Sequence, residues 1–189
     1  FPNGRLNLRR YEHITNVIST LQQQGRQVVL VSSGAIAVGV GKMGYKKRPS
    51  TIPGKQAMAA IGQAILAKIY RKFFDQHTIK VGQILLTSDV ITNVEKHKNA
   101  ENTFAKLLEM GAVPIVNEDD TVSTDEIEIG DNDTLSAMVA SICKADLLII
   151  LSAIDGFFDK DHRKNPDAKR ISIITEANEK VSNAAGSAG

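Results

Sequence analysis

Four short aliphatic runs, separated by stretches with helical periodicity, limit what this chain can fold into. The runs cover residues 28–31, 81–86, 112–116 and 147–151. The stretches between them carry apolar residues every three or four positions, which is typical of amphipathic helices. Strands that are apolar along their whole length are typical of a parallel sheet with helices on both faces. The sequence therefore predicts a three-layer α/β/α sandwich with a mainly parallel central sheet.

No internal repeat or low-complexity linker interrupts this alternation, so we expect a single domain over residues 1–189. One residue conflicts with the pattern. Pro114 lies in the third run and has no N–H to donate to a neighbouring strand. We therefore expect the pairing of that strand to be interrupted near its start.

Composition excludes several classes of protein. The formal net charge is only +2, which does not indicate a nucleic-acid-binding surface. No stretch reaches the roughly 18 apolar residues of a membrane span, and no signal peptide opens the chain. Cys143 is the single cysteine, so no intrachain disulfide is possible, and we expect it to be a packing residue. These features predict a cytoplasmic protein that binds neither nucleic acid nor a membrane.

Two kinds of motif fail on their context. The glycines at 39, 41 and 44 match G-x-G-x-x-G, but they do not follow a strand directly, and no acidic residue lies about 20 positions further on. A flexible loop explains them better than a dinucleotide site. The four histidines share no metal-ligand spacing with one another or with Cys143, so we predict no metal-ligating residues.

Polar or small residues follow three of the aliphatic runs. The first run leads into Ser-Ser-Gly-Ala at 32–35, the third leads into an acidic loop at 117–133, and the fourth leads into residues 152–158. The acidic loop holds eight of the chain's 21 acidic residues. Each segment has a plain alternative, namely a tight turn or a solvated loop. Because parallel strands end at the same edge of a sheet, however, the three segments together predict a ligand site.

Six segments, in this order, resemble the amino-acid kinase family over nearly the whole chain. They are VSSGAIAVG (31–39), KQAMAAIGQ (55–63), VGQILLT (81–87), VPIVNEDD (113–120), EIEIGDNDTLSA (126–137) and ADLLIILSAIDGFFDKDHRKNPDA (145–168). The NEDD and GDNDTLSA stretches are most similar to members that phosphorylate the γ-carboxylate of L-glutamate, the first step of proline biosynthesis. The resemblance implies this activity, with ATP and Mg²⁺ as cofactors.

The resemblance also implies roles for individual residues. The glutamate site would comprise residues from two strand exits and one helix start, namely Ser33, Gly34, Ala35, Asn117, Asp120 and Asn132. Asp133 would organise the catalytic lysines, although its place at a helix start is also that of a natural N-cap. Ser152 and Ala153 would lie on the nucleotide side, where Ala153 departs from the aspartate usual in the family. Asp120 suits the α-ammonium group of an amino acid.

Relative to the family, residues 1–189 lack a first strand with one lysine and a later segment with a second lysine. We therefore expect the sequence to be incomplete at both ends. Two other interpretations stay open: a catalytically inactive module that binds glutamate or proline, and a related kinase for acetylglutamate or a nucleoside monophosphate. The NEDD and GDND stretches argue against the latter. The resemblance further implies inhibition by proline, a homo-oligomer, and glutamate-5-semialdehyde dehydrogenase as the downstream partner that receives the labile acyl phosphate.

Overall fold

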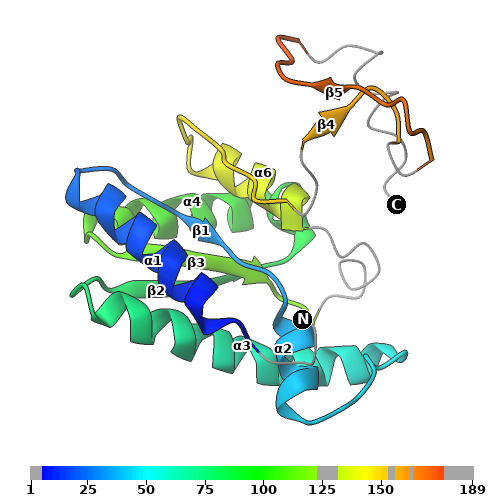
Figure 1. The fold of residues 1–189 in the computed structure, drawn as a ribbon. Helices are drawn as coiled ribbons and strands as arrows, with labels where there is room; N and C mark the ends of the chain where they lie inside the picture. Colours follow the sequence, from blue (N-terminus) through cyan, green and yellow to red (C-terminus); the bar gives the residue numbers. More distant parts are fainter. Residues whose placement is uncertain (1–5, 123–131, 153–155, 162–163, 177–189) are drawn as a thin grey trace. The chain divides into compact units, whose positions relative to one another are not determined.

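A three-stranded parallel sheet forms the centre of the first part of the chain (Figure 1). The computed structural model describes residues 6–122, 132–152, 156–161 and 164–176. These residues fall into two compact units, which divide between Leu148 and Ile149 and are described separately below. The expectation of a single domain stays a prediction.

The strands of the first unit are β1 (Leu30–Val31), β2 (Val81–Leu86) and β3 (Val113–Glu118), in the order β1-β3-β2. Both pairings are parallel, with Leu30 opposite Ile115 and Val81 opposite Val113. The parallel sheet predicted from the aliphatic runs is thereby confirmed. The first run contributes fewer paired residues than predicted, because only the two residues of β1 pair with β3.

Pro114 lies in β3, which is the central strand. The Val113 amide donates to the carbonyl of Lys80 on the β2 side at 2.9 Å. Successive N–H groups of a strand point to opposite edges, so the donor that Pro114 lacks would face β1. The pairing with β1 begins only at Ile115. The predicted interruption near the start of this strand is confirmed, and it lies on one edge only.

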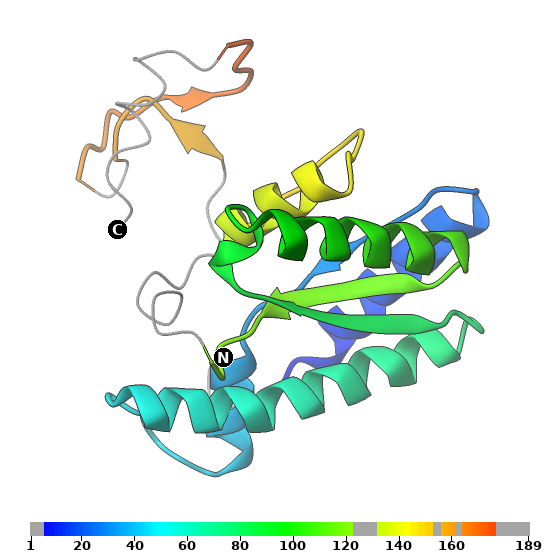
Figure 2. The same cartoon turned by 180° about the vertical axis from the view of Figure 1, so that it is seen from behind.

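Helices cover both faces of this sheet (Figure 2). On one face α1 (Leu8–Gln23) and α3 (Ile52–Asp75) enclose a core with Val113 and Ile115 of β3. On the other face α4 (Val94–Glu109) and α6 (Asn132–Ile142) pack on Val116. Residues of β3 therefore alternate between two apolar cores, which is why the whole strand reads as hydrophobic. The three-layer α/β/α arrangement is confirmed.

The ends of the helices follow local signals in the sequence. Gly25 and Gly111, just beyond α1 and α4, have φ of 81° and 70°, the left-handed conformation that ends many helices. Two further helical elements, α2 (Ala35–Lys42) and η2 (Ser88–Val90), follow β1 and β2.

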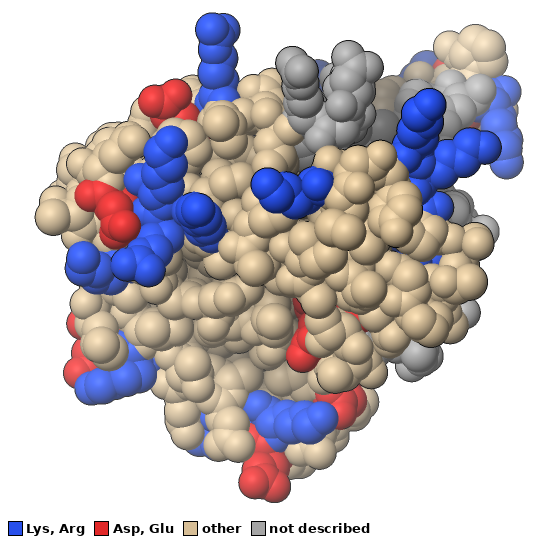
Figure 3. All heavy atoms as spheres, turned by 90° about the horizontal axis from the view of Figure 1, so that it is seen from below, with Lys and Arg blue, Asp and Glu red and all other residues tan. Residues whose placement is uncertain are grey.

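On the face of the molecule seen in Figure 3, basic and acidic side chains are interspersed among uncharged ones.

The predicted strand at 147–151 is wrong for this structure. All five residues are unpaired, and their exposed fractions run from 41% for Leu148 to 78% for Leu151. The physical reason is that the backbone N–H and C=O groups of a strand need partners on a neighbouring strand, which apolar side chains cannot supply. No strand among the described residues pairs with this run. The second unit instead contains a short antiparallel pair, β4 (Phe157–Phe158) and β5 (Arg170–Ile171).

No helix in the part of the chain that the structure describes is both long enough and apolar enough to cross a membrane.

Candidate functional site

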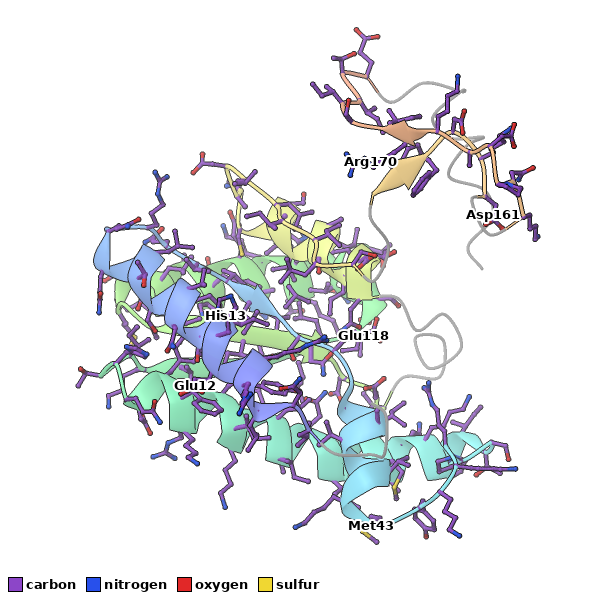
Figure 4. The ribbon with its side chains drawn as sticks, in the orientation of Figure 1. Glu12, His13, Met43, Glu118, Asp161 and Arg170 are labelled. Carbon is purple, nitrogen blue, oxygen red and sulfur yellow. The ribbon has the colours of Figure 1, made fainter. Side chains whose placement is uncertain are left out.

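The carboxyl ends of β1 and β3 lie side by side and carry buried polar groups. The Ser32 amide donates to the carbonyl of Val116 at 2.8 Å, which continues the sheet pairing by one residue. Asn117, Glu118 and Asp120 are all less than 9% exposed, and Glu118 marks the end of β3 in Figure 4. Carboxylates are seldom buried unless they are paired or serve a function. The predicted convergence of the first and third strand exits is therefore present.

A pair of amide side chains joins these exits to the start of α6. Asn132 Nδ2 donates to the carbonyl oxygen of Ser32 and, at 3.0 Å, to Asn117 Oδ1. Asn117 Oδ1 also accepts from the Glu118 amide at 2.9 Å. Because the Ser32 carbonyl can only accept and the Glu118 amide can only donate, the orientation of both side-chain amides is determined.

This orientation leaves one donor without a partner. Asn117 Nδ2 is buried and has no hydrogen-bond partner among the described residues. A buried donor that stays unpaired costs on the order of 1–3 kcal/mol, so such groups in folded proteins usually have a purpose. A ligand carboxylate or carbonyl oxygen is the kind of group that this donor would bind.

The turn after β1 adds backbone donors to the same region. Gly34 has φ of 90° and ψ of 16°, a left-handed conformation that favours glycine, and α2 begins directly after it. The N-terminus of α2 has no side-chain cap and no acidic residue in its first turn. The N–H groups of such a helix start favour an anion. Ser33 is exposed beside it, while Ala35 is buried.

Two glycines hold α2 directly against α3. A Cβ atom at Gly62 would lie 1.8 Å from the carbonyl oxygen of Ala35, and one at Gly39 would lie 2.0 Å from that of Met58. No side chain fits at either position, so the two helix backbones are in contact. The start of α2 is thus held in place by packing rather than by the turn alone.

The remaining predicted residues are Asp133, Ser152 and Ala153, and neither Asp133 nor Ser152 takes part in the hydrogen bonds described above. Asp133 is exposed in the first turn of α6, and because that helix begins at Asn132, its interpretation as an N-cap is wrong. A negative charge there is still favoured by the helix dipole. Ser152 belongs to the second unit, and Ala153 and residues 123–131 of the acidic loop lie outside the described residues. Among the described residues, no three histidine, cysteine, aspartate or glutamate side chains gather where they could hold a metal ion.

Sequence reasoning missed two residues of α3 that contact this region. Gln63 Nε2 donates to the carbonyl of Glu118 at 3.1 Å. The hydroxyl groups of Tyr70 and Ser32 share a hydrogen bond of 3.0 Å. Burial raises the pKa of Tyr70, and the bond with Ser32 offsets part of that rise, so the phenol stays protonated at neutral pH. The available signal was a glutamine and a tyrosine seven positions apart on an otherwise apolar helix face.

Comparison with known proteins identifies the family. The sequence model of the amino acid kinase family matches residues 4–189. The chain belongs to the amino acid kinase family. Membership implies that ATP is the phosphate donor. The resemblance seen in the six segments is confirmed, and so is the fold class expected from it.

Individual relatives in the amino acid kinase family are similar over the full chain. Glutamate 5-kinase from Clostridium perfringens (strain 13 / Type A) is 50% identical over 193 residues, which cover 100% of this chain and 72% of that protein. Glutamate 5-kinase from Clostridium acetobutylicum is 50% identical over 188 residues, or 100% of this chain and 70% of that protein. Glutamate 5-kinase from Thermoanaerobacter sp. (strain X514) is 48% identical over 189 residues, which cover 100% of this chain and 51% of that protein.

Proposed function

We propose that this chain is a kinase domain of a glutamate 5-kinase, and that it transfers the γ-phosphate of ATP to the γ-carboxylate of L-glutamate. The observation that carries the proposal is the Asn117–Asn132 amide pair, which lies where the exits of β1 and β3 meet. Its buried donor, Asn117 Nδ2, has no partner among the residues that the structure describes. The names of the relatives support the same activity. No described feature favours the inactive binding module.

The residue inventory suits this chemistry. A γ-carboxylate with a pKa near 4.3 is already an ionised nucleophile at neutral pH, so the domain needs no general base. Its task is to align that carboxylate with the γ-phosphorus. Neutral amides and the helix start at Ala35 would bind the carboxylates of the substrate, and the buried Asp120 would face its ammonium group. Mg²⁺ would arrive with the ATP phosphates, since it prefers phosphates and water to an all-protein cage.

The proposed site residues follow from these roles. The glutamate side comprises the residues at the two strand exits and the start of α6, namely Ser33, Gly34, Ala35, Asn117, Asp120 and Asn132. Asp133 would act as the organiser of catalytic lysines, and Ser152 with Ala153 would contact the nucleotide. The whole span 1–189 would belong to one kinase domain.

Further proposals follow from the activity. An acyl phosphate hydrolyses readily, so glutamate-5-semialdehyde dehydrogenase is the expected downstream partner. Proline, which shares the ammonium and α-carboxylate groups of glutamate, would inhibit at or near the same site. We also propose a homo-oligomer in the cytoplasm, with no nucleic-acid or membrane partner.

A hydroxylamine-trapping assay tests the central proposal. The full-length protein is incubated with ATP, Mg²⁺, glutamate and hydroxylamine, and the hydroxamate formed from the acyl phosphate is measured by its iron(III) colour. We expect hydroxamate that depends on both ATP and glutamate, and none when aspartate replaces glutamate. A verified full-length protein that formed no hydroxamate would refute the kinase assignment.

The role of Asp120 has its own test with a matched control. Asp120→Asn should raise the KM for glutamate at least about tenfold, since it removes the charge that pairs with the ammonium group. Asp119→Asn changes a neighbouring, less buried carboxylate in the same way and should leave KM within about twofold. Equal effects of the two substitutions would remove Asp120 from the ammonium site.

A further inference from the structure

Two polar side chains of helix α3 form hydrogen bonds with residues of the candidate site. Gln63 and Tyr70 are 7% and 5% exposed, in the face of α3 that otherwise packs on the sheet. Seven residues correspond to about two helical turns, so both side chains lie on the same side of the helix. Burying a glutamine amide and a phenol is costly unless each has a hydrogen-bond partner. Both partners belong to the two strand exits that form the candidate glutamate site.

Tyr70 holds the exit of β1. Its hydroxyl lies 3.0 Å from Ser32 Oγ, and the bond is buried. The backbone of Ser32 is engaged at the same time, since its amide donates to Val116 and its carbonyl accepts from Asn132 Nδ2. Tyr70 therefore fixes the residue whose carbonyl decides how the Asn132 side chain is turned.

Gln63 holds the exit of β3. Its Nε2 donates to the carbonyl of Glu118 at 3.1 Å. The amide of the same residue donates to Asn117 Oδ1 at 2.9 Å, and that oxygen also accepts from Asn132. The hydrogen bonds thus form a closed path that leaves α3 at Tyr70, passes through the amide pair and returns to α3 at Gln63.

A small cavity of about 30 Å³ lies beside this path. Four of its five polar lining residues belong to the path: Ser32, Gln63, Tyr70 and Asn117. The cavity is lined by residues of α3 and of both strand exits. The exits are joined to each other by the bond from the Ser32 amide to Val116, and to α3 by the bonds of Tyr70 and Gln63. Removing the Tyr70 hydroxyl would enlarge this space and remove the hydrogen bond to Ser32 Oγ.

We propose that Tyr70 and Gln63 are positioning residues that set the orientation of the Asn117–Asn132 amide pair and thereby the affinity for the amino-acid substrate. The proposal rests on the proposed function, because it takes the amide pair as the glutamate site. Neither side chain needs to touch the substrate. Tyr70 acts through the hydroxyl of Ser32, and Gln63 acts through the backbone carbonyl of Glu118.

Kinetics of matched variants of the full-length protein test the proposal. Tyr70→Phe removes only the hydroxyl, and Gln63→Met removes the amide while it keeps the length of the side chain. We expect each to raise the KM for glutamate about five- to twentyfold while kcat stays within twofold, because the amide pair binds the substrate equally in the ground and transition states. Tyr11→Phe is the control: the Tyr11 ring packs edge-on against Tyr70 at 5.2 Å, and no hydrogen bond to Ser32 involves it.

A double variant separates positioning from general loss of structure. If Tyr70 acts through the Ser32 hydroxyl, Ser32→Ala combined with Tyr70→Phe should raise KM no more than the larger of the two single effects. Additive effects would show that the hydroxyls act independently. A KM for Tyr70→Phe equal to that of Tyr11→Phe would overturn the role of Tyr70, and an unchanged KM for Gln63→Met would overturn that of Gln63.

A second readout does not depend on turnover. In ligand-free protein, the side-chain NH₂ resonances of Asn132 in a ¹⁵N–¹H spectrum should shift and exchange faster with water in Tyr70→Phe, but not in Tyr11→Phe. If the Asn132 resonances shift in this way but the wild-type protein forms no hydroxamate, the positioning network is supported and the kinase assignment is refuted. An unchanged Asn132 signal in an active enzyme would refute the positioning network alone.

Discussion

The runs 112–116 and 147–151 have almost the same apolar character and opposite environments. In the first, which opens β3, Val113 and Val116 are completely buried, and the strand pairs along both edges beneath helices on both faces. In the second, Leu147 is 74% and Leu151 78% exposed, and no described strand pairs with it. Apolar sequence is therefore a condition for a buried strand, and the neighbouring strands and helices decide whether one forms.

The same contrast extends to the polar residues that follow each run. Asn117, at the end of β3, is buried and has its side-chain oxygen held by two donors. Ser152, after the second run, belongs to an exposed stretch of the second unit. A strand paired on both sides can hold a side chain in a defined orientation, and this is what a binding site requires.

Matched isoleucine substitutions test this contrast most directly. Ile115→Ala should reduce the free energy of unfolding by about 2–5 kcal/mol, because it leaves a cavity in the core between the sheet and α3. Ile149→Ala, at a residue 69% exposed, should change it by less than about 0.5 kcal/mol. Denaturant unfolding of both variants measures the difference. Equal losses would mean that the second run is buried in solution.

Cysteine reactivity tests the contrast without disturbing the core. Burial raises the pKa of the Cys143 thiol to about 11, so at pH 8 almost none of it is the reactive thiolate. A cysteine introduced by Ile149→Cys in a Cys143→Ala background should have an ordinary pKa near 8.5 and react on the order of a hundredfold faster. The measurement is the rate of alkylation by iodoacetamide in native protein. Similar rates at the two positions would contradict the difference in burial.

Substitution of Gly62 tests how tightly the well-packed region is built. Gly62→Ala would place a methyl group 1.8 Å from the Ala35 carbonyl oxygen, so α2 must move away from α3 at a cost of about 1–3 kcal/mol. Gly25→Ala is the control, since an added Cβ there meets nothing within 4 Å, and only its φ of 81° opposes the change. Thermal unfolding and the KM for glutamate should both change more in Gly62→Ala. A KM that did not move would separate the packing of α2 from substrate binding.

The smallest expected effect concerns two ion pairs of Glu101 in α4. One partner is Lys98 of the same helix, and the other is Lys144 in the turn that leads to the second run. Lys144 and, to a lesser degree, Lys98 lower the pKa of Glu101 from 4.5 to about 2. A carboxyl whose pKa falls on folding stabilises the protein above about pH 4.5, and this contribution is lost as the pH falls towards 2.

Glu101→Gln should therefore lower the midpoint of thermal unfolding slightly at pH 6, and the difference from wild type should vanish near pH 2. The Glu101 side chain is 25% exposed, so solvent reaches it and 1 M salt should reduce the difference as well. A difference that grew on acidification would contradict the assigned direction of the pKa shift.

Part of the fold and site follows from the sequence because the relevant signals are local. The extent of β2, the helix ends at Gly25 and Gly111, and the interrupted pairing at Pro114 depend on residues within one or two turns. Parallel strands end at one edge whatever their side chains are, so the meeting of two strand exits was also predictable. The acidic residues indicated the loop that begins at Asn117, whereas the observed hydrogen bonds are those of Asn117 and Asn132.

Other features arise only when distant segments meet. The hydrogen bonds from Tyr70 to Ser32 and from Gln63 to Glu118 join residues 38 and 55 positions apart, and no local pattern encodes such a pairing. Asn117 Nδ2 has no partner within the described part of the chain because one neighbouring backbone donor and one distant side-chain donor occupy Asn117 Oδ1 and fix how the amide is turned.

By itself, the sequence determined the family, the parallel α/β layers and the segments that form the candidate site, since these depend on periodicity, turn residues and motifs. The tertiary structure decided which aliphatic runs become buried strands, how the two amides are turned, and that α3 supports them. The physical reason is that the burial of a residue and its hydrogen bonds depend on the groups that it contacts, and many of those groups come from other parts of the chain.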